Sequence, residues 1–184
     1  MAKTRFMFTT DLHGSETCWR KFLNSAKLFD VNALVMSGDM TGKVMVPLIQ
    51  RDNGLWDASF IGVDEVLTDE QLPEFEKKCR MISYIPYRTT REEARRIATE
   101  EEYREDLFEQ QEGEIVKVWL ALIKERVPDH VKIIISPGND DKHSIDDIIR
   151  ADPRVTFGEE EVVALDPEHE VLCVGWANPT PFDS

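Results

Sequence analysis

Short apolar runs alternate with amphipathic stretches along the chain, and this pattern predicts alternating strands and helices. Apolar, β-forming residues fill 6–10 and 33–36, which we expect to be buried strands. Between them, 15–29 carries apolar residues at helical spacing behind Ser15, a residue type that caps helix N-termini. The order strand, helix, strand implies a parallel pair with a right-handed crossover. A third buried strand is expected at 131–135.

A long insertion separates the second strand from the third. Residues 43–87 are expected to form a lid or side wall, with a hairpin at the Asn53-Gly54 step and a helix over 69–81. Residues 89–126 form the longest stretch of helical periodicity, and Gly113 is a candidate break within it.

The last part of the chain predicts a short helix over 144–150 and two strands, 161–165 and 170–174, joined by a turn. The sequence has no internal repeat and no clear linker. We therefore expect one α/β domain over 1–184, with 43–127 as an insert and helical region inside it.

Composition narrows the class of protein. The chain has 184 residues, of which 41% are hydrophobic and 32% charged, which is typical of a globular protein with one sizeable core. Its net charge of −14 disfavours general attraction to nucleic acid or anionic lipid, but not a local site for a metal cation. No apolar run approaches the roughly 20 residues that cross a bilayer, and the N-terminal residues are too polar for a signal peptide, so we expect a cytoplasmic protein.

The three cysteines, Cys18, Cys79 and Cys173, are scattered and have no C-x-x-C spacing. Neither a disulfide framework nor a zinc knuckle is indicated. We expect reduced thiols, most of them buried.

Three predicted strands each end in a turn that places a potential metal ligand. Asp11 and His13 follow the first strand, Asp39 follows the second and Asn139 follows the third. In open α/β sheets ligands bind outside the carboxyl ends of the strands, so these loops can converge. Carboxylates, an imidazole and an amide oxygen suit Mn²⁺, Fe, Zn²⁺ or Mg²⁺.

This set of side chains also suggests a reaction. Asp39 has two oxygens and could bridge two ions, with Asn139 on the second. Two divalent cations about 3.5–4 Å apart can share a hydroxide of lowered pKa and neutralise the charge that builds during attack on a phosphate ester. Each motif alone is more typical of an Asp that caps a helix or turn. Three of them in order, each after a strand, favour phosphate-ester hydrolysis.

At this point the sequence resembles the calcineurin-like metallophosphoesterase superfamily, whose pattern is D-x-H, G-D, G-N-H-D/E, a lone His, and G-H-x-H. The matching segments are Asp11-Leu12-His13, Gly38-Asp39 and Gly138-Asn139-Asp140. The resemblance implies a four-layer α/β/β/α sandwich, here incomplete, that binds two divalent metal ions. It also implies that Asp11 and His13 hold the first metal, that Asp39 bridges, and that Asn139 binds the second.

The sequence departs from this pattern at Asp140, which stands where most members have a histidine that contacts the phosphate and assists the leaving group. Asp140 could take this catalytic role only if it were protonated or acted through water. The alternative is that it caps the helix that follows.

A second departure concerns the last two histidine motifs. In the family they follow a strand like 171–176, and this sequence reaches Ser184 before either occurs. We expect 178–183 to be a loop that leads onward. His130, His143 and His169 are more typical of surface or loop residues, and only His143 is close enough in sequence to Asn139 to act as a substitute ligand.

The leading hypothesis is a hydrolase, a metallophosphoesterase that uses divalent ions such as manganese, iron, zinc or magnesium, acts on a small phosphodiester or phosphomonoester and binds no membrane. The alternative is a non-catalytic phosphoesterase-like scaffold or binding subunit with a degenerate or incomplete metal site. In a third hypothesis a second subunit of a homo-oligomer completes the site, since an unfinished sheet edge invites pairing.

Overall fold

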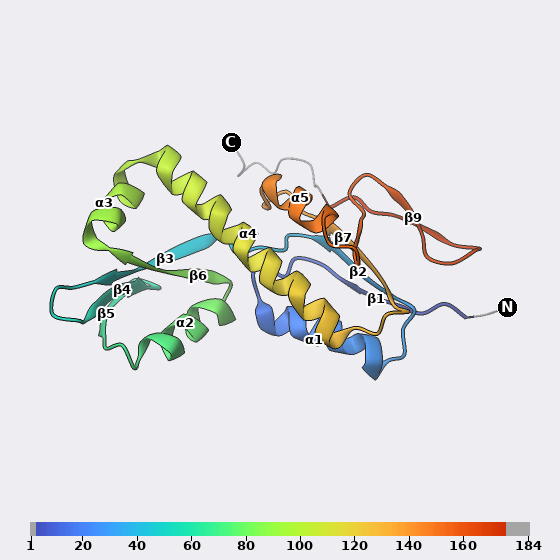
Figure 1. Cartoon of the computed structure of the whole chain (residues 1–184), viewed down its shortest axis with the longest axis horizontal. Coiled ribbons are helices and arrows are strands. Elements are labelled where there is room, and N and C mark those ends of the chain that lie inside the picture. The colour runs from blue at the N-terminus through green and yellow to red at the C-terminus, as the bar shows by residue number, and fades with distance from the viewer. Residues whose placement is uncertain (1–2, 176–184) are drawn as a thin grey trace.

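The computed structural model describes residues 3–175, which alternate helices and strands around two separate four-stranded sheets (Figure 1). The protein is mixed α/β. The elements in chain order are β1 Phe6–Thr9, α1 Glu16–Leu28, β2 Ala33–Gly38, β3 Val44–Gln50, β4 Trp56–Phe60, β5 Val63–Leu67, α2 Leu72–Met81, β6 Tyr84–Thr90, α3 Arg91–Thr99, α4 Glu101–Arg126, β7 Lys132–Pro137, α5 Ser144–Arg150, β8 Thr156–Phe157, β9 Val162–Ala164 and β10 Glu170–Leu172. The predicted strands and helix of the first 38 residues are confirmed, including Ser15 as the N-cap of α1.

The first sheet has the strand order β1-β2-β7-β8, and all its pairs are parallel. The central strands β2 and β7 are buried on both faces, which explains their continuous apolar sequences. On one face Leu34 and Met36 of β2 join Ile133 and Ile135 of β7 in a core with residues of α1, α4 and α5. This core fixes the sheet under its helices.

Two tryptophans lock α1 to α4 inside this core. The rings of Trp19 and Trp119 stack with centroids 5.1 Å apart, and Trp19 Nε1 donates a hydrogen bond to the backbone oxygen of Trp119 at 3.0 Å. Both side chains are buried. A tryptophan inside a core needs a partner for its indole N–H, and a helix carbonyl provides it here.

The other face of the first sheet is covered in part by β9 and β10. Their antiparallel pairing confirms the two strands predicted near the C-terminal end. Val163 and Cys173 pack against Val35 and Ile134, whereas Phe8 on the edge strand β1 stays 53% exposed. A four-layer sandwich would need a second large sheet on this face, and the described residues place only the two-stranded hairpin there. The four-layer arrangement therefore stays a prediction.

The insertion forms a second sheet with the order β5-β4-β3-β6. The predicted hairpin is confirmed, because Arg51 N–H donates to Leu55 O at 2.8 Å between β3 and β4. The predicted helix is α2, which packs Phe75 against Leu48 of this sheet. Strands β5 and β6 were not predicted. Pro86 in β6 is tolerated because β6 is an edge strand, where a missing N–H breaks no ladder hydrogen bond.

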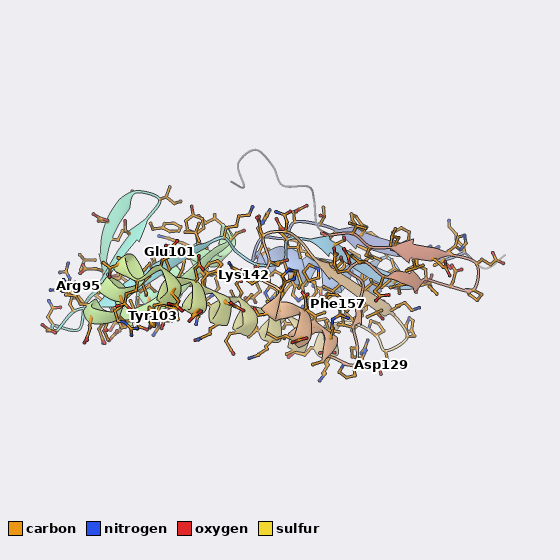
Figure 2. All side chains as sticks on the ribbon, turned by 90° about the horizontal axis from the view of Figure 1, so that it is seen from above. Arg95, Glu101, Tyr103, Asp129, Lys142 and Phe157 are labelled. Atoms are coloured by element: carbon orange, nitrogen blue, oxygen red, sulfur yellow. The ribbon has the colours of Figure 1, made fainter. Side chains whose placement is uncertain are left out.

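Helix α4 connects the two sheets. The expected break at Gly113 is wrong, because α4 continues through this residue and the helical stretch divides at Glu100 instead, where ψ is 99°. Gly113 is buried, and a Cβ there would lie 3.1 Å from Ile148 Cδ1, so the glycine allows close packing of α4 on α5. Figure 2 shows Tyr103, near the start of α4, at the insertion end of the molecule and Asp129, just after α4, in the half that holds the first sheet.

All three cysteines are free thiols, as expected, with Cys79 and Cys173 buried and Cys18 exposed. Within residues 3–175, none of the helices combines the length and the apolar character needed to span a bilayer.

Replacement of Trp19 by alanine tests the contact between α1 and α4. We expect Trp19→Ala to lower the free energy of unfolding by about 3–5 kcal/mol, because it removes a buried ring and its hydrogen bond to the Trp119 carbonyl. Urea denaturation followed by circular dichroism measures this change. Leu28→Ala on the same helix is the control, since Leu28 is 75% exposed and should cost less than about 0.5 kcal/mol. Equal losses in both variants would contradict this role of Trp19.

Candidate metal centre

The predicted ligands lie at one edge of the first sheet. Strands β1, β2 and β7 run parallel, and their register pairs Thr9 with Met36 and Met36 with Ile135. Their carboxyl ends therefore lead into three neighbouring loops. This is the edge at which open α/β sheets bind ligands.

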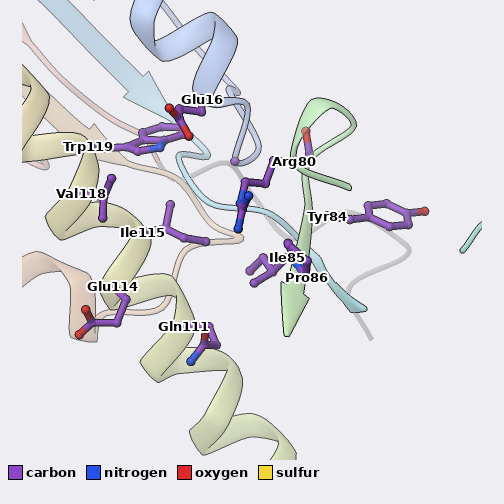
Figure 3. Close-up of a pocket in the computed structure, with 12 residues that line it drawn as sticks. Glu16, Arg80, Tyr84, Ile85, Pro86, Gln111, Glu114, Ile115, Val118 and Trp119 are labelled. Atoms are coloured by element: carbon purple, nitrogen blue, oxygen red, sulfur yellow. The ribbon is translucent and has the colours of Figure 1, made fainter. Parts of the chain in front are cut away.

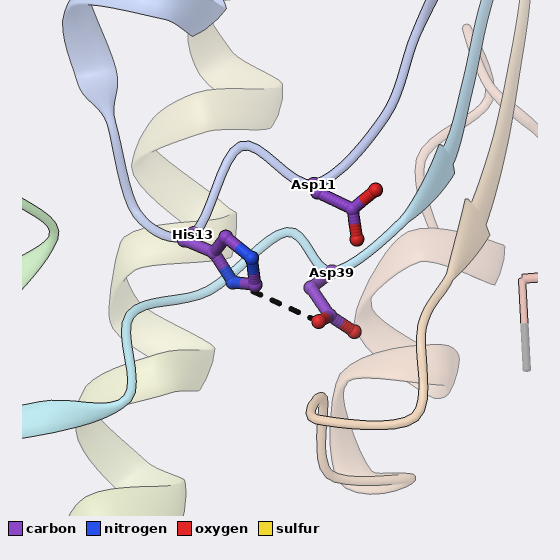
Figure 4. A group of neighbouring side chains, drawn as sticks. All are labelled: Asp11, His13 and Asp39. Atoms are coloured by element: carbon purple, nitrogen blue, oxygen red, sulfur yellow. Dashed lines mark ion pairs between the residues drawn. The ribbon is translucent and has the colours of Figure 1, made fainter. Parts of the chain in front are cut away.

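Two of these loops bring together three side chains that can hold a metal ion. Asp11, His13 and Asp39 each offer one ligand atom, and these atoms all lie within 4.8 Å of one another. His13 Nδ1 is 3.7 Å from Asp39 Oδ2, as the dashed line in Figure 4 marks. The grouping of Asp11, His13 and Asp39 agrees with the prediction from the sequence.

The backbone of the first loop turns sharply at both of its candidate ligands. Asp11 has φ 50° and His13 has φ 44°, in the left-handed region that residues other than glycine seldom adopt. The turn is held by the second loop: His13 N–H donates to Asp39 O at 3.1 Å, and Gly14 N–H donates to Met40 O at 2.7 Å. Strained backbone of this kind concentrates at functional sites.

Glycines let the three loops approach one another. Gly38 has φ 116°, and a Cβ there would lie 2.6 Å from Thr10 Oγ1. A Cβ at Gly138 would lie 2.1 Å from Asp39 Oδ1. The turn at Gly138 can thus press directly against the ligand Asp39, whose Oδ1 accepts the Asp140 N–H at 3.1 Å.

Asp39 is the most deeply buried of the three candidate ligands, with 5% of its surface exposed. Burial raises the pKa of Asp39 to about 6, and the nearby carboxyl groups of Asp140 and Asp141 add to this rise, while the Asp140 N–H opposes it. A cation beside this side chain would favour its charged form.

His13 completes the argument for a metal ion. Its Nδ1 is buried and has no hydrogen-bond partner among the described residues. An unpartnered imidazole nitrogen beside two carboxylates has the nitrogen and oxygen donors that Mn²⁺, Fe or Zn²⁺ accepts. Asp11, His13 and Asp39 therefore fit a divalent cation.

Lys43 is a charged residue of this site that the sequence analysis missed. Its ammonium group pairs with the Asp140 carboxylate and lies 3.9 Å from Asp39 Oδ2. Its hydrogen bond to Asp140 raises the pKa of Lys43. Burial opposes ionisation of Asp140, but hydrogen bonds from Lys43 and Asp39 leave the pKa of Asp140 below its ordinary value. The only signal in the sequence is the position of Lys43, four residues after Asp39.

Asp140 does not cap the helix that follows, so this alternative is wrong. The N-cap of α5 is His143, which makes no capping side-chain hydrogen bond. Asn139 is exposed on the same turn, where its Nδ2 donates to Asp140 Oδ1 at 3.3 Å. Its role as a ligand of a second ion stays a prediction.

The other histidines lie elsewhere. Within residues 3–175, the cluster of acidic and histidine ligands includes none of His130, His143 and His169. His169 pairs with Asp166 in the turn between β9 and β10. The predicted loop at 178–183, and the end of the strand expected over 171–176, lie outside the described residues.

A cavity of about 310 Å³ lies between α4 and β6 and reaches the loop after β1 at Gly14 (Figure 3). Gly14, the neighbour of His13, forms part of its wall, and Ile85, Ile115 and Trp119 contribute apolar surface. Arg80 extends into the space between these side chains (Figure 3). The volume of the cavity lies at the lower end of the range for small-molecule pockets.

Comparisons of the chain with protein-family models, with curated proteins and with solved structures find no match.

Binding of Mn²⁺ should stabilise the folded protein, because only the folded chain assembles Asp11, His13 and Asp39. At a concentration about 100 times Kd the gain is about 2.7 kcal/mol. Thermal unfolding with and without Mn²⁺ measures it. We expect Asp39→Asn to abolish the shift, whereas Asp64→Asn, an exposed substitution in β5, should keep it. A full shift in Asp39→Asn would exclude Asp39 as a ligand.

Proposed function

We propose that the protein is a divalent-metal-dependent phosphoesterase that hydrolyses a small phosphodiester or phosphomonoester. One observation carries the proposal: Asp11, His13 and Asp39 cluster at the carboxyl ends of two adjacent parallel strands. This placement supports the resemblance to the calcineurin-like metallophosphoesterases, for which the same residues match the D-x-H and G-D motifs.

Each residue of the site has a proposed role. Asp11, His13 and Asp39 would hold a first ion, and Asp39 together with Asn139 would hold a second. Bound divalent ions supply Lewis acidity and lower the pKa of an attacking water. Lys43 places a positive charge beside the ligands, where it can attract an anionic ester.

Asp140 acts differently from the histidine that it replaces. Its pairing with Lys43 favours the charged carboxylate, which cannot donate a proton to a leaving group. We propose that Asp140 orients Lys43 toward the substrate phosphate, and that the leaving group takes its proton from water.

The charge of the chain favours a small substrate. A net charge of −14 repels the extended phosphate backbone of nucleic acid. The cavity of about 310 Å³ beside Gly14 is large enough for a compact organic group. We therefore propose a small phosphate ester as the substrate.

A second candidate is a phosphoesterase-like binding domain that holds a metal without turnover. The observation that favours it is the ion pair between Lys43 and Asp140 at the position where a catalytic histidine is expected. This candidate shares the metal centre and differs only in the absence of hydrolysis.

Hydrolysis of bis-p-nitrophenyl phosphate with added Mn²⁺ tests the proposed reaction. We expect turnover by the wild type and a loss of about 100-fold or more in Asp39→Asn, since even outer partners of metal sites affect activity 10–100-fold. Asp64→Asn is the matched control and should keep the wild-type rate.

Calorimetric titration of the same proteins with Mn²⁺ separates the two candidates. Binding without turnover would favour the binding domain over the enzyme. Turnover that is equal in wild type and Asp39→Asn would contradict both candidates.

A further inference from the structure

A buried network joins the middle of α4 to two of the ligand loops. The Thr41 hydroxyl lies 2.7 Å from Glu112 Oε1 and 2.7 Å from Asp141 Oδ1. All three residues are buried, and Glu112 has no exposed surface. None of the three is among the proposed metal ligands.

Asp141 is the part of the network that connects the loops. Its Oδ2 accepts the N–H groups of Met40 and Gly138, both at 2.9 Å, and its Oδ1 accepts the Thr41 N–H at 2.9 Å. One carboxylate thus ties the loop that carries Asp39 to the loop that carries Asn139. Three backbone donors are the surroundings of a charged carboxylate.

The number of protons available to the Thr41 hydroxyl and the two carboxyl groups beside it places one proton on Glu112. The Thr41 hydroxyl has a single proton and can donate it to only one of the two carboxyl groups beside it. Asp141 is held as a carboxylate by three N–H groups, so it is the acceptor of that proton. The short contact between Thr41 and Glu112 then requires a protonated Glu112 that donates to Thr41 Oγ1.

The surroundings of Glu112 agree with a neutral carboxyl group. Its Oε2 is buried without a hydrogen-bond partner among the described residues, which costs far less for a neutral acid than for a carboxylate. Burial raises the pKa of Glu112 to about 7; the hydrogen bond with Thr41 lowers it, and the charge of Asp141 adds to the rise. Glu109 on the same helix acts in the same direction, whereas Lys142 on the facing loop opposes it.

We infer that Glu112 is a positioning residue, whose carboxyl proton acts through Thr41 to hold Asp141 in place and with it the two loops that carry Asp39 and Asn139. The inference rests on the proposed function, because the loops matter through the metal ions they are proposed to bind. When Glu112 loses its proton, its hydrogen bond to Thr41 is lost and a second negative charge faces Asp141.

The sign of the pH effect follows from where the proton is bound. Between the ordinary pKa of 4.5 and a pKa of about 7, the folded protein keeps a proton on Glu112 that the unfolded chain releases. Raising the pH from about 4.5 to about 7 therefore lowers the stability of the folded protein, and the ligand loops loosen as the pH passes about 7, where folded Glu112 loses its proton.

Four variants test the network. Glu112→Gln keeps a neutral donor toward Thr41 and removes the titration, while Glu112→Leu removes the donor. Thr41→Val breaks the network in the middle, and Thr41→Ser restores the hydroxyl. We expect Glu112→Leu and Thr41→Val to weaken Mn²⁺ binding about tenfold at pH 6, and Glu112→Gln and Thr41→Ser to bind as the wild type does.

The measurements are calorimetric Mn²⁺ titrations and metal-free thermal unfolding, each from pH 5 to pH 8.5. We expect the Mn²⁺ affinity and the melting temperature of the wild type to fall relative to Glu112→Gln as the pH rises. Parallel profiles for these two proteins, or a Glu112→Gln variant that binds as weakly as Glu112→Leu, would overturn the inference while leaving the metal centre intact. Absence of Mn²⁺ binding in the wild type would instead remove the proposed function and this inference together.

Discussion

The parallel pairing of β1, β2 and β7 is the constraint on which the site depends. Because neighbouring strands run in the same direction, residues more than one hundred positions apart leave the sheet at the same edge. A shift of this register would move the turn at Gly138 away from Asp39, which it now contacts through the Asp140 N–H. The buried, apolar sequences of β2 and β7 hold the register, since they pack on both faces.

The loops at this edge adopt unfavourable backbone conformations, which let them approach one another closely. Asp11 and His13 adopt left-handed conformations, and Gly38 and Gly138 occupy places that no side chain could fill. A left-handed conformation at a non-glycine residue costs about 1–3 kcal/mol. The packing of the core beneath the loops, including the stacked rings of Trp19 and Trp119, stabilises the fold and offsets this conformational cost.

Local patterns in the sequence predicted the features that depend on neighbouring residues in the chain. Strands β1, β2 and β7, the hairpin between β3 and β4, and the grouping of Asp11 with Asp39 follow from apolar runs and from turns at strand ends. The continuity of α4 through Gly113 depends on the approach of α5, which the helix sequence does not contain.

The positions of Lys43 and Glu112 could not be predicted in the same way. Glu112 meets Thr41 across 71 positions, and Asp141 meets Met40 across 101, so only the folded chain brings them together. On a helix surface rich in charged residues, a glutamate that ends up buried looks the same as its solvated neighbours. The spacing of Glu112 in the sequence does not distinguish a buried glutamate from a solvated one.

The acidic residues around the site are each compensated by a different means. Asp141 accepts three backbone N–H groups, Asp140 pairs with Lys43, and Glu112 stays neutral by keeping its proton. What remains is Asp39 with Asp11 and the unpartnered nitrogen of His13. Asp39 is buried, and no lysine or arginine other than the more distant Lys43 forms an ion pair with it among the described residues. Asp11 and Asp39 accept single hydrogen bonds from Thr10 and from the Asp140 N–H, but in the part of the chain that the structure describes no strong cationic partner lies against them, and a divalent cation could supply that charge.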